Sequence, residues 1–102
     1  MRDRLRVESL DDTNHIVITR SSTHPVSYAI TLVTTWRGRD YAVRTFDNAH
    51  TADEHHEHRY IGPDKQPPTV ESGPVNEAMV RALDRIQRNW RAYVEEWKRT
   101  VS

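Results

Sequence analysis

A long amphipathic pattern near the C-terminus constrains the fold of this 102-residue chain more than any other feature. Apolar residues recur from Val75 to Trp97 at spacings of three and four, the period of a helix with one buried face. Ser72-Gly73-Pro74 supplies a capping residue and a proline suited to a first turn. We therefore predict one helix over residues 74–99, with Trp90 and Trp97 in the core.

Strand patterns fill the chain before this helix. Alternating and β-branched segments predict strands over residues 4–10, 15–20, 26–36, 40–46 and 55–61. Within the fourth of these, simple alternation sets Tyr41 and Val43 on one face, against Ala42, Arg44 and Phe46 on the other.

Residues 62–73 carry glycine and prolines without periodicity, which predicts a connector between the sheet and the helix. The chain is thus expected to be a single α+β domain over residues 1–102. It consists of an antiparallel sheet of four or five strands within residues 4–61, and the long helix packs on one face of that sheet.

Composition narrows the function only slightly. Lys plus Arg equals Asp plus Glu at 15 each, so net charge argues neither for nor against a nucleic-acid partner. Cysteine is absent, which excludes a thiol nucleophile and a thiolate zinc site. No apolar run reaches the length of about 20 residues that a membrane span needs, so we expect a cytoplasmic protein with no membrane partner. Only 35% of the residues are hydrophobic. A core this thin, covered by one helix, is compatible with a homodimer.

The feature most suggestive of chemistry is a histidine-rich segment over residues 46–61, which holds four of the six histidines and several acidic residues. Imidazoles titrate near pH 7, so such a cluster can move protons or hold a metal ion. In an ideal strand, His56, His58 and Tyr60 share one face, whereas His55, Glu57 and Arg59 share the other. His56 and His58 can therefore act on the same object.

One hypothesis is metal-free acid–base cleavage of RNA. This reaction needs a base for the 2′-hydroxyl proton, an acid for the leaving 5′-oxygen and a cation for the phosphoryl charge. The histidines His50, His56 and His58 are the candidate acid–base groups, and Asp47 would orient one imidazole. Arg59 would supply charge and Tyr60 a hydrogen bond.

Three other interpretations remain open at this point. His50, His56 and His58 could hold zinc or another divalent metal in a hydrolase, because two imidazoles two residues apart on a strand can reach one ion. The cluster could instead be an ordinary solvated surface. The chain could also be a non-catalytic module that binds another protein or itself.

The stretch Phe46-Asp47-Asn48-Ala49-His50, followed by His55-His56-Glu57-His58, resembles a family signature. That signature, Asp-Asn-Ala-Pro-His-His…His-His-Lys-His, belongs to the TumE-type toxins of prokaryotic toxin–antitoxin modules. The resemblance implies a small α+β endoribonuclease-like growth inhibitor that acts on RNA. It also implies a helix-turn-helix antitoxin as partner. Asp47, His50, His56 and His58 fall on the motif positions.

Arginines recur along the predicted helix. Arg81, Arg85 and Arg88 line one side and could follow RNA phosphates, since guanidinium groups bind phosphate oxygens in pairs. The alternative is a solvated face with internal ion pairs, because Asp84 lies three and four residues from Arg81 and Arg88. The sequence favours this second interpretation.

Overall fold

The computed structural model describes residues 4–21, 26–48 and 53–101. The strands in chain order are β1 (Arg4–Ser9), β2 (Asn14–Arg20), β3 (Tyr28–Trp36), β4 (Arg39–Asp47), β5 (Glu54–Ile61), β6 (Asp64–Lys65) and β7 (Thr69–Ser72). One helix, α1 (Val75–Val101), follows them. The predicted α+β class is confirmed, with an antiparallel sheet and one long C-terminal helix.

The sheet has seven strands, so the prediction of four or five was wrong. Its order is β1-β2-β3-β4-β5-β6, and β7 pairs with β5. The two additional strands, β6 and β7, lie within residues 62–73, which the sequence predicted as a plain connector. All residues of β6 and β7 are exposed. Backbone pairing with β5, rather than an apolar pattern, makes them strands, and sequence periodicity has nothing to detect there.

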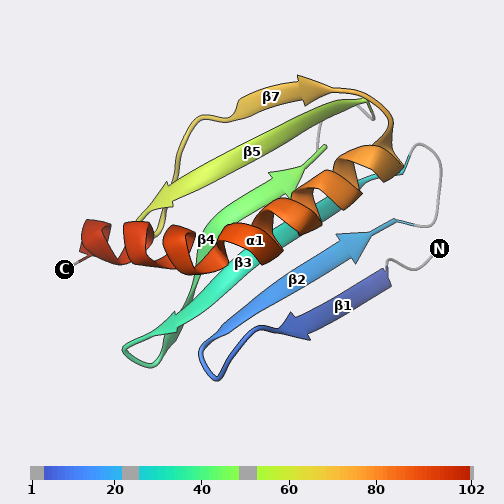
Figure 1. Cartoon of the computed structure of the whole chain (residues 1–102). Coiled ribbons are helices and arrows are strands. Elements are labelled where there is room, and N and C mark those ends of the chain that lie inside the picture. The colour runs from blue at the N-terminus through green and yellow to red at the C-terminus, as the bar shows by residue number, and fades with distance from the viewer. Residues whose placement is uncertain (1–3, 22–25, 49–52, 102) are drawn as a thin grey trace.

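Helix α1 lies across one face of the sheet, as Figure 1 shows. It begins after Gly73, where φ is +143°, and the amide of Ala78 donates to the carbonyl of Pro74 at 3.0 Å. Its apolar stripe is buried against the strands, which confirms the predicted core positions of Trp90 and Trp97. The core consists of Ile16, Ile18, Tyr28, Ile30, Leu32, Val43, Phe46, Ala82, Ile86, Trp90, Val94 and Trp97. Among the described residues, no helix is long and apolar enough to cross a membrane.

A bulge in β4 changes which of its side chains face the helix. Leu32 pairs with Arg44 but Val33 pairs with Ala42, so Val43 is an extra residue in β4. Phe46, opposite Ile30, therefore joins the core, and the alternation predicted for residues 40–46 was wrong. The bulge also sets the faces of the residues that follow it. Asp47, opposite Ala29, lies on the face that α1 does not cover, which we call the open face.

Candidate functional site

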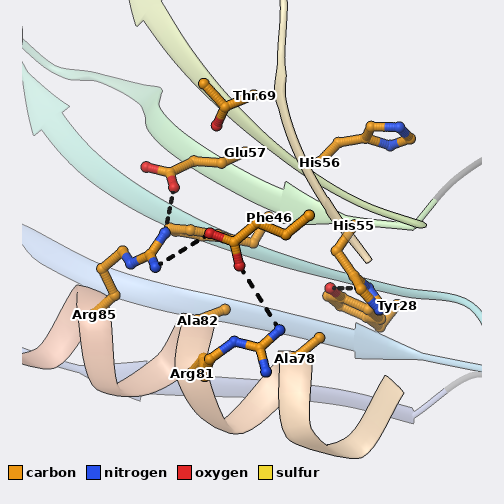
Figure 2. Close-up of a pocket in the computed structure, with 11 residues that line it drawn as sticks. Tyr28, Phe46, His55, His56, Glu57, Thr69, Ala78, Arg81, Ala82 and Arg85 are labelled. Carbon is orange, nitrogen blue, oxygen red and sulfur yellow. Dashed lines mark hydrogen bonds and ion pairs between the residues drawn. The ribbon is translucent and has the colours of Figure 1, made fainter. Parts of the chain in front are cut away.

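Pairing between β4 and β5 brings three predicted site residues together. Asp47 stands directly opposite His56, and Thr45 stands opposite His58. These four side chains lie on the open face, because their neighbour Phe46 faces the core. Figure 2 shows His56 directed away from His55 and from the helix. The structure thus collects Asp47, His56 and His58 into one group, which we call the histidine pair site.

Acidic groups hold both ring nitrogens of His56. Nδ1 lies 3.4 Å from Asp47 Oδ1, and Nε2 lies 3.2 Å from Glu54 Oε1. The His56 side chain is only 7% exposed. A carboxylate oxygen accepts hydrogen bonds, so both contacts are donated at once only by the doubly protonated ring. Each ring nitrogen of His56 thus faces one carboxylate.

His58 is held differently. Its Nδ1 lies 2.9 Å from the carbonyl oxygen of Gln66, which can only accept, so Nδ1 carries the proton. In the neutral ring Nε2 then has the lone pair of a base. Nε2 lies 3.8 Å from Asp47 Oδ2, and the ring centroids of His56 and His58 are 6.2 Å apart. The two rings are therefore close neighbours in different hydrogen-bonding environments.

Sequence reasoning missed Lys65 and Gln66. The Lys65 ammonium lies 4.0 Å from Asp47 Oδ2, and Gln66 provides the carbonyl that orients His58. Both residues belong to the segment interpreted as a connector. Only its pairing with β5, where Lys65 stands opposite Tyr60, places them at the site. A lysine and a backbone carbonyl in a stretch without periodicity carry no signal that could have identified them.

The other predicted catalytic residues do not all lie beside the histidine pair site. Arg59 lies on the face of the helix, where it forms an ion pair with Glu96, and so does not join His56 and His58. Tyr60 is half-buried, and its hydroxyl is 3.3 Å from Thr45 Oγ1, on the residue opposite His58. His50 lies outside the described residues.

The other face of β5 lines a small hollow beneath α1, shown in Figure 2. His55 Nε2 donates to the carbonyl of Gly73 at 2.7 Å, and its Nδ1 accepts from the Tyr28 hydroxyl at 2.9 Å. Burial raises the pKa of Tyr28 to about 12, and the negative charge of Asp47 adds to the effect. The hollow has a volume of about 30 Å³, room for about two water molecules. It is too small for a nucleotide.

The three predicted RNA-binding arginines are engaged in ion pairs. Arg85 contacts Glu57 at 2.7 Å and Glu71 at 3.6 Å. Arg81 lies 3.7 Å from Glu71, and Arg88 lies 2.9 Å from Asp84. These pairs partly neutralise the stripe. Helix α1 also lies on the face of the sheet opposite the histidine pair site, so the structure does not bring the arginines to it.

Asn48, which belongs to the histidine-rich motif, has a structural position. It is 3% exposed, its Oδ1 accepts from the amide of Tyr28 at 2.9 Å, and its Nδ2 donates to the carbonyl of Val26 at 2.8 Å. These bonds fasten the end of β4 to the start of β3. Asp47, the preceding residue, is thereby held in place at the site.

The described ranges contain no group of three or more His, Asp or Glu side chains arranged to hold a metal ion. His50, one of the three predicted ligands, is not among them. Comparison of the chain with protein-family models, with curated proteins and with solved structures finds no match. The resemblance to TumE-type toxins stays a prediction based on its motif residues.

Proposed function

We propose that the histidine pair site cleaves RNA by acid–base catalysis. The observation that carries the proposal is the position of Asp47, whose two carboxylate oxygens lie 3.4 Å from His56 Nδ1 and 3.8 Å from His58 Nε2. One carboxylate thus faces a ring nitrogen of each of two neighbouring imidazoles. The rings also differ in their other partners, which suits the division of labour that phosphodiester cleavage requires.

His58 is assigned as the base. With Nδ1 bonded to the Gln66 carbonyl, its Nε2 accepts the proton of a ribose 2′-hydroxyl, and the 2′-oxygen forms a bond to phosphorus. His56, held between Asp47 and Glu54, is assigned as the acid. It donates its proton to the 5′-oxygen as the bond from phosphorus to that oxygen breaks. The products are a 2′,3′-cyclic phosphate and a 5′-hydroxyl.

Lys65 and Asp47 complete the assignment. The Lys65 ammonium lies at the edge of the site and is suited to the charge that builds on the phosphoryl oxygens. Asp47 is a positioning residue, since it contacts the imidazoles and acts through them. In a cell, this activity would make the chain a growth inhibitor, and the resemblance to TumE-type toxins suggests a helix-turn-helix antitoxin as its partner.

The test uses purified protein and an end-labelled RNA of mixed sequence, with and without EDTA. The proposal expects the wild type to cleave in both conditions and the His56→Ala/His58→Ala variant to leave the RNA intact. His15→Ala is the matched control and should cleave normally, because His15 is also on the open face but on β2, with β3 and β4 between it and β5.

Three results would count against the proposal. Intact RNA under every condition would remove it, and cleavage that EDTA abolishes would favour the alternative of a divalent metal held by the same histidines. Cleavage that persists in the double variant would place the activity elsewhere.

A further inference from the structure

One border of the sheet is formed by β1. This strand pairs with β2 on one side, and among the described residues no strand pairs with its other side. Figure 1 shows β1 at the border opposite β7. A strand at a sheet edge presents unpaired backbone N–H and C=O groups that can pair with another chain. The outer side of β1 can therefore pair with one more strand.

Apolar side chains on β1 are unusually exposed. Leu5 is 67% exposed and Val7 is 57% exposed. They stand opposite Thr19 and Val17 of β2, so both belong to the open face. A neighbour along this edge would cover part of their surface, which gives such contact a favourable apolar contribution.

The charges of β1 select which neighbour fits. Arg6 and Glu8 share the other face of the strand, and they form an ion pair with each other. In an antiparallel pairing of β1 with a second copy of itself, side chains keep to their faces when the two-fold axis lies at a residue, which can be Leu5, Arg6, Val7 or Glu8. An axis at Glu8 sets the two Glu8 residues opposite each other, and an axis at Leu5 sets Arg4 opposite Arg6 twice. An axis at Arg6 sets Arg4 opposite Glu8 twice but also Arg6 opposite Arg6, so each of these three registers contains a like-charge contact, which is unfavourable. Centring on Val7 sets Arg6 opposite Glu8 of the second copy, and Glu8 opposite Arg6.

We propose that two copies of this chain pair through β1, antiparallel, about a two-fold axis at Val7. Each contact away from the axis then occurs twice, as a symmetric dimer requires. Val7 meets Val7 of the second copy, and Leu5 stands opposite Ser9. The axis runs perpendicular to the sheet, so both α1 helices lie on one side and both open faces form one continuous surface on the other. The histidine pair sites lie towards its two outer ends.

The experiment is sedimentation equilibrium over a wide range of concentration, with the wild type and three variants. We expect a reversible monomer–dimer equilibrium for the wild type. Arg6→Glu and Glu8→Arg should each weaken dimerisation about tenfold, because two attractive contacts become repulsive. The Arg6→Glu/Glu8→Arg exchange restores opposite charges in the same register and should recover dimerisation.

Two controls keep the result specific. Arg88→Glu disrupts another exposed ion pair, on α1, and should leave the equilibrium unchanged. Circular dichroism melting shows that each variant is folded. A wild type that stays monomeric up to millimolar concentration would overturn the proposal. So would a dimer that the single charge reversals do not weaken, or a folded double exchange that fails to recover it. None of these measurements depends on RNA cleavage.

Discussion

His56 Nδ1 and Asp47 Oδ1 lie 3.4 Å apart, on residues that stand directly opposite each other in the ladder between β5 and β4. The backbone pairing therefore fixes this contact, and a change of side chain can test it without moving the strands. The bulge at Val43 sets the faces of β4 beyond it, and so contributes to this geometry.

Asp47→Asn tests the positioning assignment. The amide keeps the shape of the carboxylate but removes its charge, so His56 and His58 lose the negative charge that faces both rings. We expect kcat for RNA cleavage to fall about 10- to 100-fold with little change in KM, as for other groups that orient a catalytic histidine. Asp64→Asn, on the exposed strand β6, is the control and should behave like the wild type. Full activity in Asp47→Asn would refute the role given to this residue.

Glu57 and Glu71 offer a matched comparison of ion-pair stability, because both contact Arg85. Glu57 also contacts Arg44 at 2.6 Å, and its side chain is 16% exposed against 53% for Glu71. Glu57→Gln should lower the free energy of unfolding by about 2–3 kcal/mol, since it removes the carboxylate that the largely buried Arg44 contacts and leaves Arg85 only its longer contact with Glu71. Glu71→Gln should cost less than about 1 kcal/mol. Urea unfolding followed by tryptophan fluorescence measures both, and equal losses would contradict the difference in burial.

Tyr28 should make the fold sensitive to alkali. Burial raises the pKa of its hydroxyl to about 12 in the folded chain, from 10.0 for an ordinary tyrosine. The folded chain therefore holds the proton of this hydroxyl more tightly than the unfolded chain does, which favours folding as long as the hydroxyl is neutral. That contribution is complete below pH 10 and is lost as pH rises towards 12, by about 2 kcal/mol.

The matching variant is Tyr28→Phe. It removes the hydrogen bond to His55, at a cost of about 1 kcal/mol at neutral pH, and removes this alkaline loss. Unfolding free energies measured at neutral pH and near pH 11 should therefore differ less in the variant than in the wild type. An unchanged alkaline slope would show that Tyr28 does not titrate in this way.

Asp11 should stabilise the turn between β1 and β2 in a way that depends on pH. Its carboxylate accepts from the amide of Thr13 at 2.9 Å and from the amide of Asn14 at 2.8 Å. The bond from Thr13 is the main reason that the pKa of Asp11 is lowered. A lowered pKa stabilises the fold above the usual aspartate range, and this stabilisation is lost as pH falls through it.

Asp11→Ala should therefore have a lower Tm than the wild type at neutral pH, and the difference should shrink in acid. The neighbouring exposed residue provides the control, as Asp12→Ala should change Tm little. A Tm difference that stays constant from neutral to acidic pH would contradict the assignment to the carboxylate.

The sequence predicted the helix and the central strands because both have large apolar residues at a clear period. It did not predict β7, whose four residues are all exposed and owe their strand conformation to pairing with β5. It also set Val43 and Phe46 on opposite faces although both join the core, because a bulge inserts one residue without leaving a mark in the apolar pattern.

The site was predictable to a similar extent. Alternation along one strand placed His56 and His58 on the same face, and the adjacent strand contributed Asp47. Lys65 and the Gln66 carbonyl come from β6 and the residue after it, and their contribution depends on tertiary folding that local spacing does not encode.

The chemistry of the RNA backbone tests the central claim most directly. A mixed-sequence RNA and its fully 2′-O-methylated copy are each incubated with the wild type and with His56→Ala/His58→Ala, in EDTA, and the fragment ends are identified. The account predicts fragments with 2′,3′-cyclic phosphate ends from the unmodified RNA and the wild type alone. Cleavage of the methylated RNA, or cyclic phosphate ends produced equally by the variant, would contradict it, as would RNA left intact by the wild type.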